Sequence, residues 1–277
     1  MTTLQVLRKR SKSIRATADM ASAMKTASSV KYARIARILN GIEAYSTACE
    51  HALSLFGDAV LPRKTASVKT RNAMVLLSND RGFCGGFNSE LLKFFGKCLE
   101  EEEESPLLLV NGQKGITFCR ERGLDFEELE LPEIPSYGDA EKLTEKLFEL
   151  YNEGEVSSVK LVFQRFANMM TQVPSVETIL PPAPAESGET ADMLFLPDRE
   201  TALQAPAMYC LVNSVYHILL EHSAGIQAAT TIAMRNACDN AEKSLEEMEM
   251  LINRIRQAEV TNSVIETSSF LAGNFES

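Results

Sequence analysis

The sequence has 277 residues and a formal net charge of −10; 45% of its residues are hydrophobic and 24% are charged. That length allows one large domain or two ordinary ones, and the composition is that of a folded protein. No run of about 18 apolar residues occurs, so no membrane-spanning helix is expected, and the charged N-terminal segment predicts no secretory signal. The six cysteines never stand at CxxC spacing, so neither a disulfide framework nor a zinc site is predicted, and reduced thiols in a cytosolic compartment are expected.

The N-terminal segment, residues 1–58, is predicted to be one long helix. It contains no proline, and small or apolar residues recur every three or four positions from Leu7 to Ile42. Gly57, Asp58 and Pro62 are expected to end the helix. Nine basic residues stand before position 38, with Asp19 as the only acid. They indicate either an acidic partner or a solvated helix face.

The C-terminal segment, residues 207–277, repeats this pattern and predicts a second long helix. A linker rich in proline, glycine and serine is predicted at residues 183–206, before that helix. Two long helices with one apolar stripe each can cover one another, so we expect an antiparallel two-helix coiled coil. The predicted seam is rich in small residues, which allow close approach of the backbones: Ala18, Ala21, Ser28, Ala229 and Ala233.

The central segment, residues 70–182, predicts a Rossmann-like open α/β domain with a mostly parallel sheet, because short apolar runs alternate with amphipathic stretches. The predicted strands are Ala73–Leu77, Leu107–Val110, Asp125–Leu131, Val159–Phe163 and Val176–Leu180. The predicted helices are Ser89–Glu104, Lys114–Arg122 and Asp139–Asn152. The fold class is therefore long helices combined with a central α/β domain.

A glycine-rich loop, SNDRGFCGGFN at residues 78–88, lies between the first strand and the first helix of this domain. It fits neither the GxxxxGK[ST] nor the GxGxxG pattern, so its glycines are expected to serve a turn or a close backbone approach rather than a nucleotide. Cys84 could act as a nucleophile only with a base, and the three histidines, His51, His217 and His222, all lie on the predicted long helices. His217 and His222 are five positions apart, on different helix faces, which disfavours a metal pair. We predict no catalytic residue, cofactor, metal or small-molecule substrate.

Three stretches of the chain resemble the gamma subunit of the F-type ATP synthase. The glycine-rich loop is similar to that family's S-x-D-[RK]-G-[LF]-C-G-x-x-N motif. The C-terminal runs IAMRNACDNA and NRIRQAEVT are similar to VAM-x-AA-x-DNA and N-x-x-RQA-x-IT. The N-terminal run aligns with the family's opening helix at its typical positions: Arg8, Ser13, Thr17, Ala23, Met24 and Lys31.

The resemblance implies a non-catalytic central-stalk rotor that couples proton-driven rotation of a membrane ring to ATP synthesis or hydrolysis. Its implied partners are the alpha and beta subunits of the catalytic ring, the epsilon subunit and the c-subunit ring. Its implied location is peripheral, on the cytoplasmic side of a bacterial plasma membrane. By the same resemblance, the residues expected at subunit interfaces are Met24, Asp80, Arg81, Cys84, Arg256, Gln257 and Thr261.

The chain departs from the family pattern at several positions. Ser22 stands where the family commonly has lysine; Ile226 and Thr230 stand where it has a glutamate and an arginine; and Ser263 stands where it has an acid. Two other interpretations stay open from the residues alone. One is a basic coiled coil that binds nucleic acid or an acidic protein, although the chain lacks a helix-turn-helix or interleaved aromatics. The other is an enzyme that uses Cys84.

Overall fold

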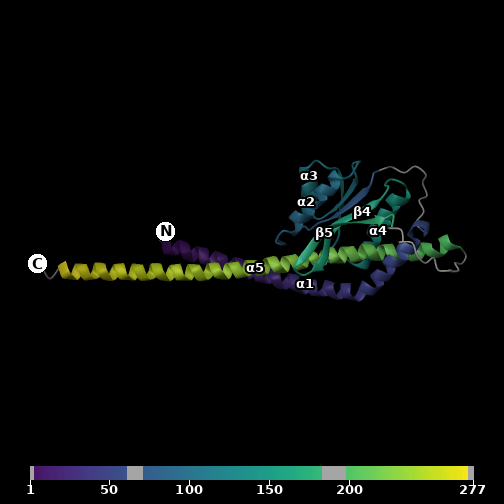
Figure 1. Ribbon diagram of the computed structural model, residues 1–277. Coiled ribbons are helices and arrows are strands. Elements are labelled where there is room, and N and C mark those ends of the chain that lie inside the picture. Colours follow the sequence, from purple (N-terminus) through teal and green to yellow (C-terminus); the bar gives the residue numbers. More distant parts are fainter. Residues whose placement is uncertain (1–2, 61–70, 183–197, 274–277) are drawn as a thin grey trace. The chain divides into compact units, whose positions relative to one another are not determined.

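The computed structural model describes residues 3–60, 71–182 and 198–273 of the protein. The long helices α1 (Thr3–Val60) and α5 (Arg199–Gly273) flank a central α/β domain in the sequence (Figure 1). The chain forms two compact units: Met1–Ala27 with Thr231–Ser277, and Ser28–Thr230. Because each long helix continues from one unit into the other, both units contain a pair of α1 and α5 segments.

The α/β domain is built on a five-stranded sheet with the order β3-β2-β1-β4-β5. Strands β1 (Ala73–Leu77), β2 (Leu107–Asn111), β3 (Phe126–Leu129) and β4 (Val159–Asn168) are parallel, whereas β5 (Thr171–Leu180) pairs antiparallel with β4. The predicted open, mostly parallel sheet is thus confirmed. The last two strands are longer than predicted, because their outer ends carry polar residues that hide the strand pattern from a search for apolar runs.

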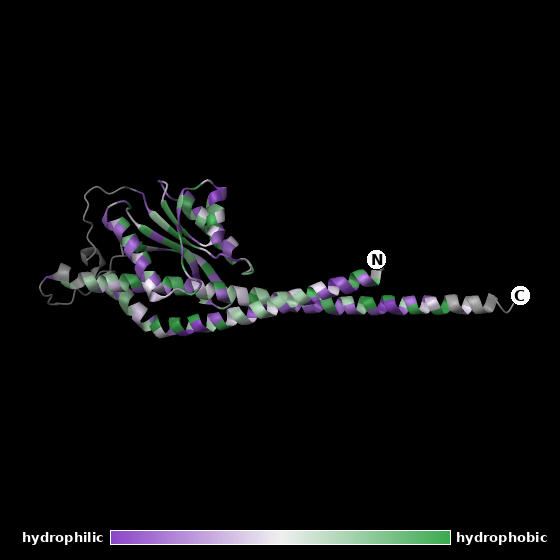
Figure 2. Ribbon diagram, turned by 180° about the vertical axis from the view of Figure 1, so that it is seen from behind, coloured by the Kyte–Doolittle hydropathy of each residue, from purple (hydrophilic) through white to green (hydrophobic). Residues whose placement is uncertain are grey.

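Helices cover both faces of the sheet (Figure 1). On one face, α2 (Phe87–Glu100) and α3 (Gln113–Glu121) pack through Leu91, Phe95 and Ile116 onto Met74 and Val110. The other face carries a larger apolar cluster, to which α4 (Tyr137–Asn152) and the first part of α5 contribute. Consecutive residues of β1 point into the two clusters in turn, so all five of its residues are buried. Figure 2 shows the corresponding hydrophobic strands at the centre of the domain.

Within the unit Ser28–Thr230, α1 and α5 run antiparallel. Ile35 of α1 packs with Leu220 and Ala224 of α5, and earlier on α5 the Asn213 amide donates a hydrogen bond to the Ser46 hydroxyl at 3.0 Å. The residue numbers of the contacts therefore increase along α1 as they decrease along α5, which is the pattern of antiparallel helices. The sheet and this helix pair share side chains in one continuous core, since Cys49 of α1 and Leu211 of α5 join the cluster under the sheet.

Within the other unit, α1 and α5 are also antiparallel. Ala21 packs with Met234 and Cys238, and the Arg15 guanidinium lies 3.5 Å from the Glu249 carboxylate further along α5. The buried side chains of this seam are few and mostly small, as the sequence predicted. The far end of α5 exposes apolar side chains: Val260, Val264 and Ile265.

Two helix ends lie at other residues than the ones that the sequence suggested. Helix α1 continues through Gly57 and Asp58 to Val60, because glycine and aspartate weaken a helix by only about 1 kcal/mol or less without breaking it. Helix α5 begins at Arg199 and contains Pro206, so the last residues of the predicted linker are helical. Pro206 is exposed, and because it has no backbone N–H it cannot donate the helix hydrogen bond to the Ala202 carbonyl. Pro62 and residues 183–197 lie outside the described residues.

Within the part of the chain that the structure describes, no helix combines the length and hydrophobicity that a bilayer crossing requires. Figure 2 agrees with this, because polar and apolar residues alternate along both long helices.

Candidate functional site

The glycine-rich loop, residues 78–88, leaves the end of β1 and is anchored to the end of β2. The Ser78 hydroxyl donates to the carbonyl oxygen of Asn111 at 2.7 Å and accepts from the Gly115 N–H at 2.9 Å. Gly112 has φ +89°, and a Cβ there would lie 2.4 Å from the Ser78 carbonyl oxygen. This close approach fixes where the loop begins relative to α3.

The Asn88 side chain holds the loop together from inside. Its Oδ1 accepts from the Asn79 N–H at 3.3 Å, and its Nδ2 lies 3.3 Å from the Arg81 carbonyl oxygen and 3.2 Å from Cys84 Sγ. Asn88 is only 8% exposed, so these bonds form away from water. The final asparagine of the motif is therefore explained by internal loop structure.

The predicted interface residues of this loop have three different environments. Asp80 is exposed, and its Oδ1 accepts from the Gln113 N–H at 3.0 Å, near the start of α3. Arg81 is exposed, and its backbone N–H lies 3.5 Å from Asn79 Oδ1. The Cys84 side chain is only 3% exposed, which disfavours a direct contact with another subunit through its thiol.

Phe83 is a candidate contact residue that the sequence did not single out. Its side chain is 60% exposed, and its φ of +66° is unusual for a bulky residue. Gly85 has φ +60°, so the expected conformational role of glycine holds at this position. Between them the backbone is bent so that Cys84 points inward while Phe83 points outward. No residue pattern would have revealed that orientation.

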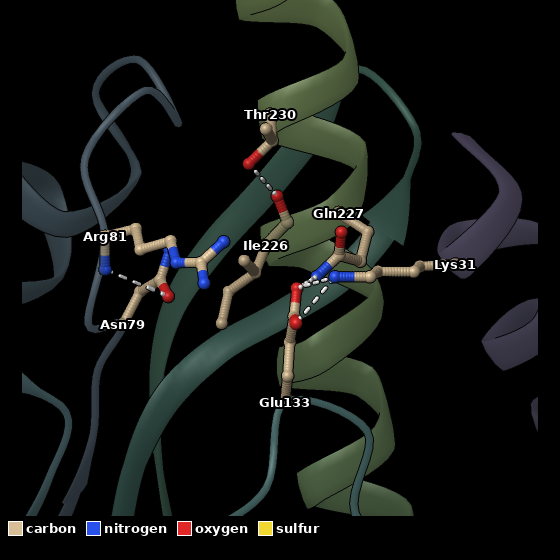
Figure 3. Close-up of polar contacts among 7 residues, drawn as sticks. All are labelled: Lys31, Asn79, Arg81, Glu133, Ile226, Gln227 and Thr230. Carbon is tan, nitrogen blue, oxygen red and sulfur yellow. Dashed lines mark hydrogen bonds and ion pairs between the residues drawn. The ribbon is translucent and has the colours of Figure 1, made fainter. Parts of the chain in front are cut away.

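A polar contact beside this loop connects three segments of the chain (Figure 3). The Lys31 ammonium of α1 lies 2.7 and 2.6 Å from the two carboxylate oxygens of Glu133. The Gln227 amide of α5 donates to Glu133 Oε1 at 3.0 Å. Burial opposes ionisation of Glu133, but these two donors and the charges of Lys31 and Arg81 together lower the pKa of its carboxyl. The sequence did not identify Glu133, because it is one acid among many.

Two positions at which the chain departs from the family pattern lie next to this contact. In Figure 3 the Ile226 side chain lies between the Arg81 guanidinium and the Glu133 carboxylate. The Thr230 hydroxyl donates to the Ile226 carbonyl oxygen at 2.8 Å, so its hydrogen bond remains within α5. Neither side chain carries a charge, and among the described residues the charged partner nearest to Lys31 is Glu133.

The remaining candidate residues belong to the unit formed by Met1–Ala27 and Thr231–Ser277. Met24 is half-buried in the seam with Ala21 and Met234. Arg256, Gln257 and Thr261 are exposed on α5. The Thr261 hydroxyl donates to the Gln257 carbonyl oxygen at 2.9 Å, while the side chains of Arg256 and Gln257 extend from an exposed helix face.

The two other departures lie on the same unit. Ser22 is exposed on α1, and its carbonyl oxygen accepts from the Thr26 hydroxyl at 3.0 Å. Ser263 is exposed on α5, with its hydroxyl 2.9 Å from the Val260 carbonyl oxygen. Both positions therefore present small polar groups instead of charges.

The arrangement does not favour chemistry at Cys84. Its thiol accepts a hydrogen bond from the Asn88 amide. Within the described ranges, no cluster of three or more histidine, cysteine or acidic side chains could hold a metal. His222 is buried, with its Nδ1 accepting from the Gln164 N–H at 3.3 Å. What the molecule does present is exposed groups on a loop and on two helices, which suits binding to other proteins.

Comparison with known proteins gives the family. The family profile described as ATP synthase matches residues 3–269. The chain belongs to the ATP synthase gamma-chain family. It is 31% identical to the ATP synthase gamma chain of Moorella thermoacetica over 96% of this chain and 97% of that one. It is 30% identical to that of Pelotomaculum thermopropionicum, with the same coverage of each chain.

Solved structures share the gamma-chain fold. The rotor of the Euglena gracilis mitochondrial ATP synthase matches with a TM-score of 0.66 at 14% identity, covering 93% of this chain and 99% of that one. The central stalk and c-ring structure from Tetrahymena thermophila matches with a TM-score of 0.57 at 18% identity, covering 79% and 99%. Two long helices with a central five-stranded sheet are thus the family's architecture.

As a gamma chain, the protein is a subunit of a membrane-associated ATP synthase and is not the catalyst itself. The prediction of a non-catalytic rotor subunit is confirmed. The alternative of a basic coiled coil that binds nucleic acid gains no support from these matches. The residues predicted at subunit interfaces are placed by the structure, but their contacts stay predictions.

Proposed function

We propose that this gamma chain turns inside a ring of alpha and beta subunits and forces their nucleotide sites through different conformations in turn. Protons crossing a c-subunit ring drive the rotation, and the α/β domain meets that ring and the epsilon subunit. The protein works at the cytoplasmic face of a bacterial plasma membrane, attached peripherally through the complex.

The observation that carries this proposal is the continuity of α1 and α5. Each helix contributes to the α/β-containing unit and to the unit formed by Met1–Ala27 and Thr231–Ser277. A two-helix segment with a seam of small residues is slender enough to stand within a ring of subunits. Its exposed apolar end at Val260, Val264 and Ile265 is a surface suited to burial by surrounding chains.

The basic residues in the N-terminal half of α1 support the proposal that acidic groups of other subunits surround this part of the helix. Arg8, Arg10 and Arg15 lie on exposed positions of α1, and the pair between Arg15 and Glu249 is largely exposed and therefore weak. These charges remain available to acidic loops of the beta subunits. We further propose that several exposed or half-buried residues lie at subunit interfaces of the complex: Asp80 and Arg81 in the glycine-rich loop, Met24 in the seam, and Arg256, Gln257 and Thr261 on α5.

Single-molecule rotation tests this function. The chain, with Glu121→Cys on the exposed end of α3, is assembled with its alpha and beta subunits, and a bead is attached to that cysteine. The six native cysteines are all buried, so labelling is selective. We expect the bead to rotate in one direction with ATP and to stop without it. ATP hydrolysis by an assembled complex with a motionless bead would contradict the proposal.

A further inference from the structure

The segment between β3 and α4, residues 131–136, is fixed at both ends. The Leu131 N–H donates to Asn111 Oδ1 at 3.3 Å, which holds its start against the end of β2. At its other end, Ser136 and Asp139 form a reciprocal capping box at the start of α4. Two prolines, Pro132 and Pro135, restrict the backbone between these anchors. The segment, which we call the strap, is therefore held firmly by the α/β domain.

The strap touches both long helices through an apolar contact. Ile134 packs against a buried cluster that contains Ile35 of α1 and Leu220 and Ala224 of α5. Ile35 and Leu220 are fully buried. One side chain of the strap thus lies against the line where the two helices meet.

The strap also touches both helices through a polar contact. Glu133, the residue before Ile134, binds Lys31 of α1 through both of its oxygens and Gln227 of α5 through one of them. Gln227 is 2% exposed, so its bond to a carboxylate is shielded from water. Figure 3 shows Lys31 and Gln227 reaching Glu133 from two different helices.

We propose that the strap transmits torsional force between the α/β domain and the two long helices. Glu133 is the positioning residue that keeps the strap aligned with α1 and α5. The inference rests on the proposed rotary function. A carboxylate bound to α1 and α5 at once resists sliding of either helix past the domain. Ile134 adds close packing at the same line, and the hydrogen bonds of Glu133 add a fixed geometry to it.

The chain offers a matched control for testing Glu133. The ion pair between Arg120 of α3 and Glu128 of β3 has the same oxygen–nitrogen distance, 2.6 Å, and its carboxylate is as exposed as that of Glu133, although Arg120 is more exposed than Lys31. This pair lies wholly within the α/β domain. Glu133→Gln and Glu128→Gln therefore remove the same charge and one ion pair each. Only the first change loosens a contact with α1 and α5.

The experiment uses the assembled complex with a bead on Glu121→Cys, held between ATP-driven steps. We expect Glu133→Gln to broaden the angular fluctuation of the bead, while Glu128→Gln leaves it unchanged. Hydrogen exchange of the α1 amides around Lys31 should accelerate roughly fivefold in Glu133→Gln only, as expected when a partly exposed ion pair with one shielded bond is lost. Equal fluctuation and equal exchange in the two variants would overturn the proposal.

A charge exchange separates positioning from simple loss of stability. Lys31→Glu combined with Glu133→Lys restores the ion pair, and the Gln227 amide can turn to accept from the new ammonium. We expect narrower fluctuations than in either single variant, although the Arg81 charge opposes full recovery. A double variant that behaves as the sum of the two single changes would refute the role of Glu133. Failure of the unmodified complex to rotate would refute the rotary function instead, so the two failures are distinguishable.

Discussion

The backbone N–H of Gln164 on β4 donates a hydrogen bond to Nδ1 of His222 on α5, over 3.3 Å. This bond requires a neutral imidazole that carries its proton on Nε2. His222 is 4% exposed, and its ring lies 5.4 Å from that of Phe87 at the start of α2. One side chain thus joins the sheet, the long helix and the helix that follows the glycine-rich loop.

The first prediction concerns acid sensitivity. Burial lowers the pKa of His222 from 6.5 to about 3, against a smaller opposing effect of the Ser78 backbone. Below pH 6.5 the unfolded chain binds a proton at His222 that the folded chain refuses, so stability falls as the pH drops towards 3. The free energy of unfolding should therefore fall with decreasing pH, and the slope that His222 contributes approaches about 1.4 kcal/mol per pH unit.

His222→Gln should remove that slope, because a glutamine amide can still accept a hydrogen bond but does not titrate. Urea unfolding between pH 7 and pH 4 measures the effect. His217→Gln, on the same helix and half-buried, serves as the control and should keep the slope. An unchanged slope in His222→Gln would show that His222 is protonated in the folded state.

The second prediction concerns Gly112. Alanine there would combine a φ of +89° with a Cβ that meets the Ser78 carbonyl oxygen at 2.4 Å, a backbone atom that cannot move freely. We expect Gly112→Ala to destabilise the α/β domain by about 3 kcal/mol or more. Gly123→Ala is the matched control, since Gly123 has φ +65° but no atom within 4 Å of its Cβ position.

Gly123→Ala should cost only about 1 kcal/mol, the backbone strain alone. Chemical unfolding of both variants measures the difference. Equal losses would mean that the close approach between Gly112 and Ser78 relaxes in solution.

The third prediction concerns the loop that Asn88 holds together. Asn88→Ala removes a buried amide with bonds to Asn79, Arg81 and Cys84, which should cost about 1–3 kcal/mol locally. Cys84, 3% exposed in the intact loop, should then react faster with a maleimide, as measured by mass spectrometry of the labelled peptide. Ser89→Ala, which removes one exposed bond to Gly86, is the control and should leave Cys84 protected.

The architecture was predictable because its signals are local. Alternation of apolar runs and amphipathic stretches revealed β1 and α4, and spacing of three and four residues revealed both long helices. The exact ends were not predictable, since Gly57 and Pro206 are tolerated once packing elsewhere stabilises a helix. A helix end is decided by the tertiary surroundings that a local pattern does not contain.

The site was less predictable than the fold. The resemblance located Asp80 and Arg81 in the loop and Arg256 and Gln257 on α5, all of which are exposed. It also included Cys84, whose side chain the loop turns inward, because a motif records residue types and not their directions. Glu133 was missed because it belongs to no motif: its contacts come from Lys31 and Gln227, on helices that are far away in the sequence.

The last prediction concerns Arg256 and Gln257. A guanidinium has five donors in a fixed plane, and an amide has both a donor and an acceptor, so this pair can bind carboxylates and backbone groups of a surrounding subunit. Both side chains are exposed on α5, while Thr261 returns its hydroxyl to the Gln257 carbonyl oxygen and so stays within the helix. If the contacts form at some rotor angles and break at others, their loss slows turnover more than it weakens assembly.

The double change Arg256→Ala with Gln257→Ala tests this in the complex with alpha and beta subunits, by separate measurement of ATPase rate and complex yield. A charge-assisted hydrogen bond is worth about 1.5–3 kcal/mol, which corresponds to up to roughly a hundredfold in rate at one step. Arg254→Ala removes the same charge two positions away, on another face of α5, and should change neither quantity. Normal turnover at normal yield in the double variant would mean that the two side chains only solvate the helix, whereas lost yield with normal specific activity would make them an assembly contact.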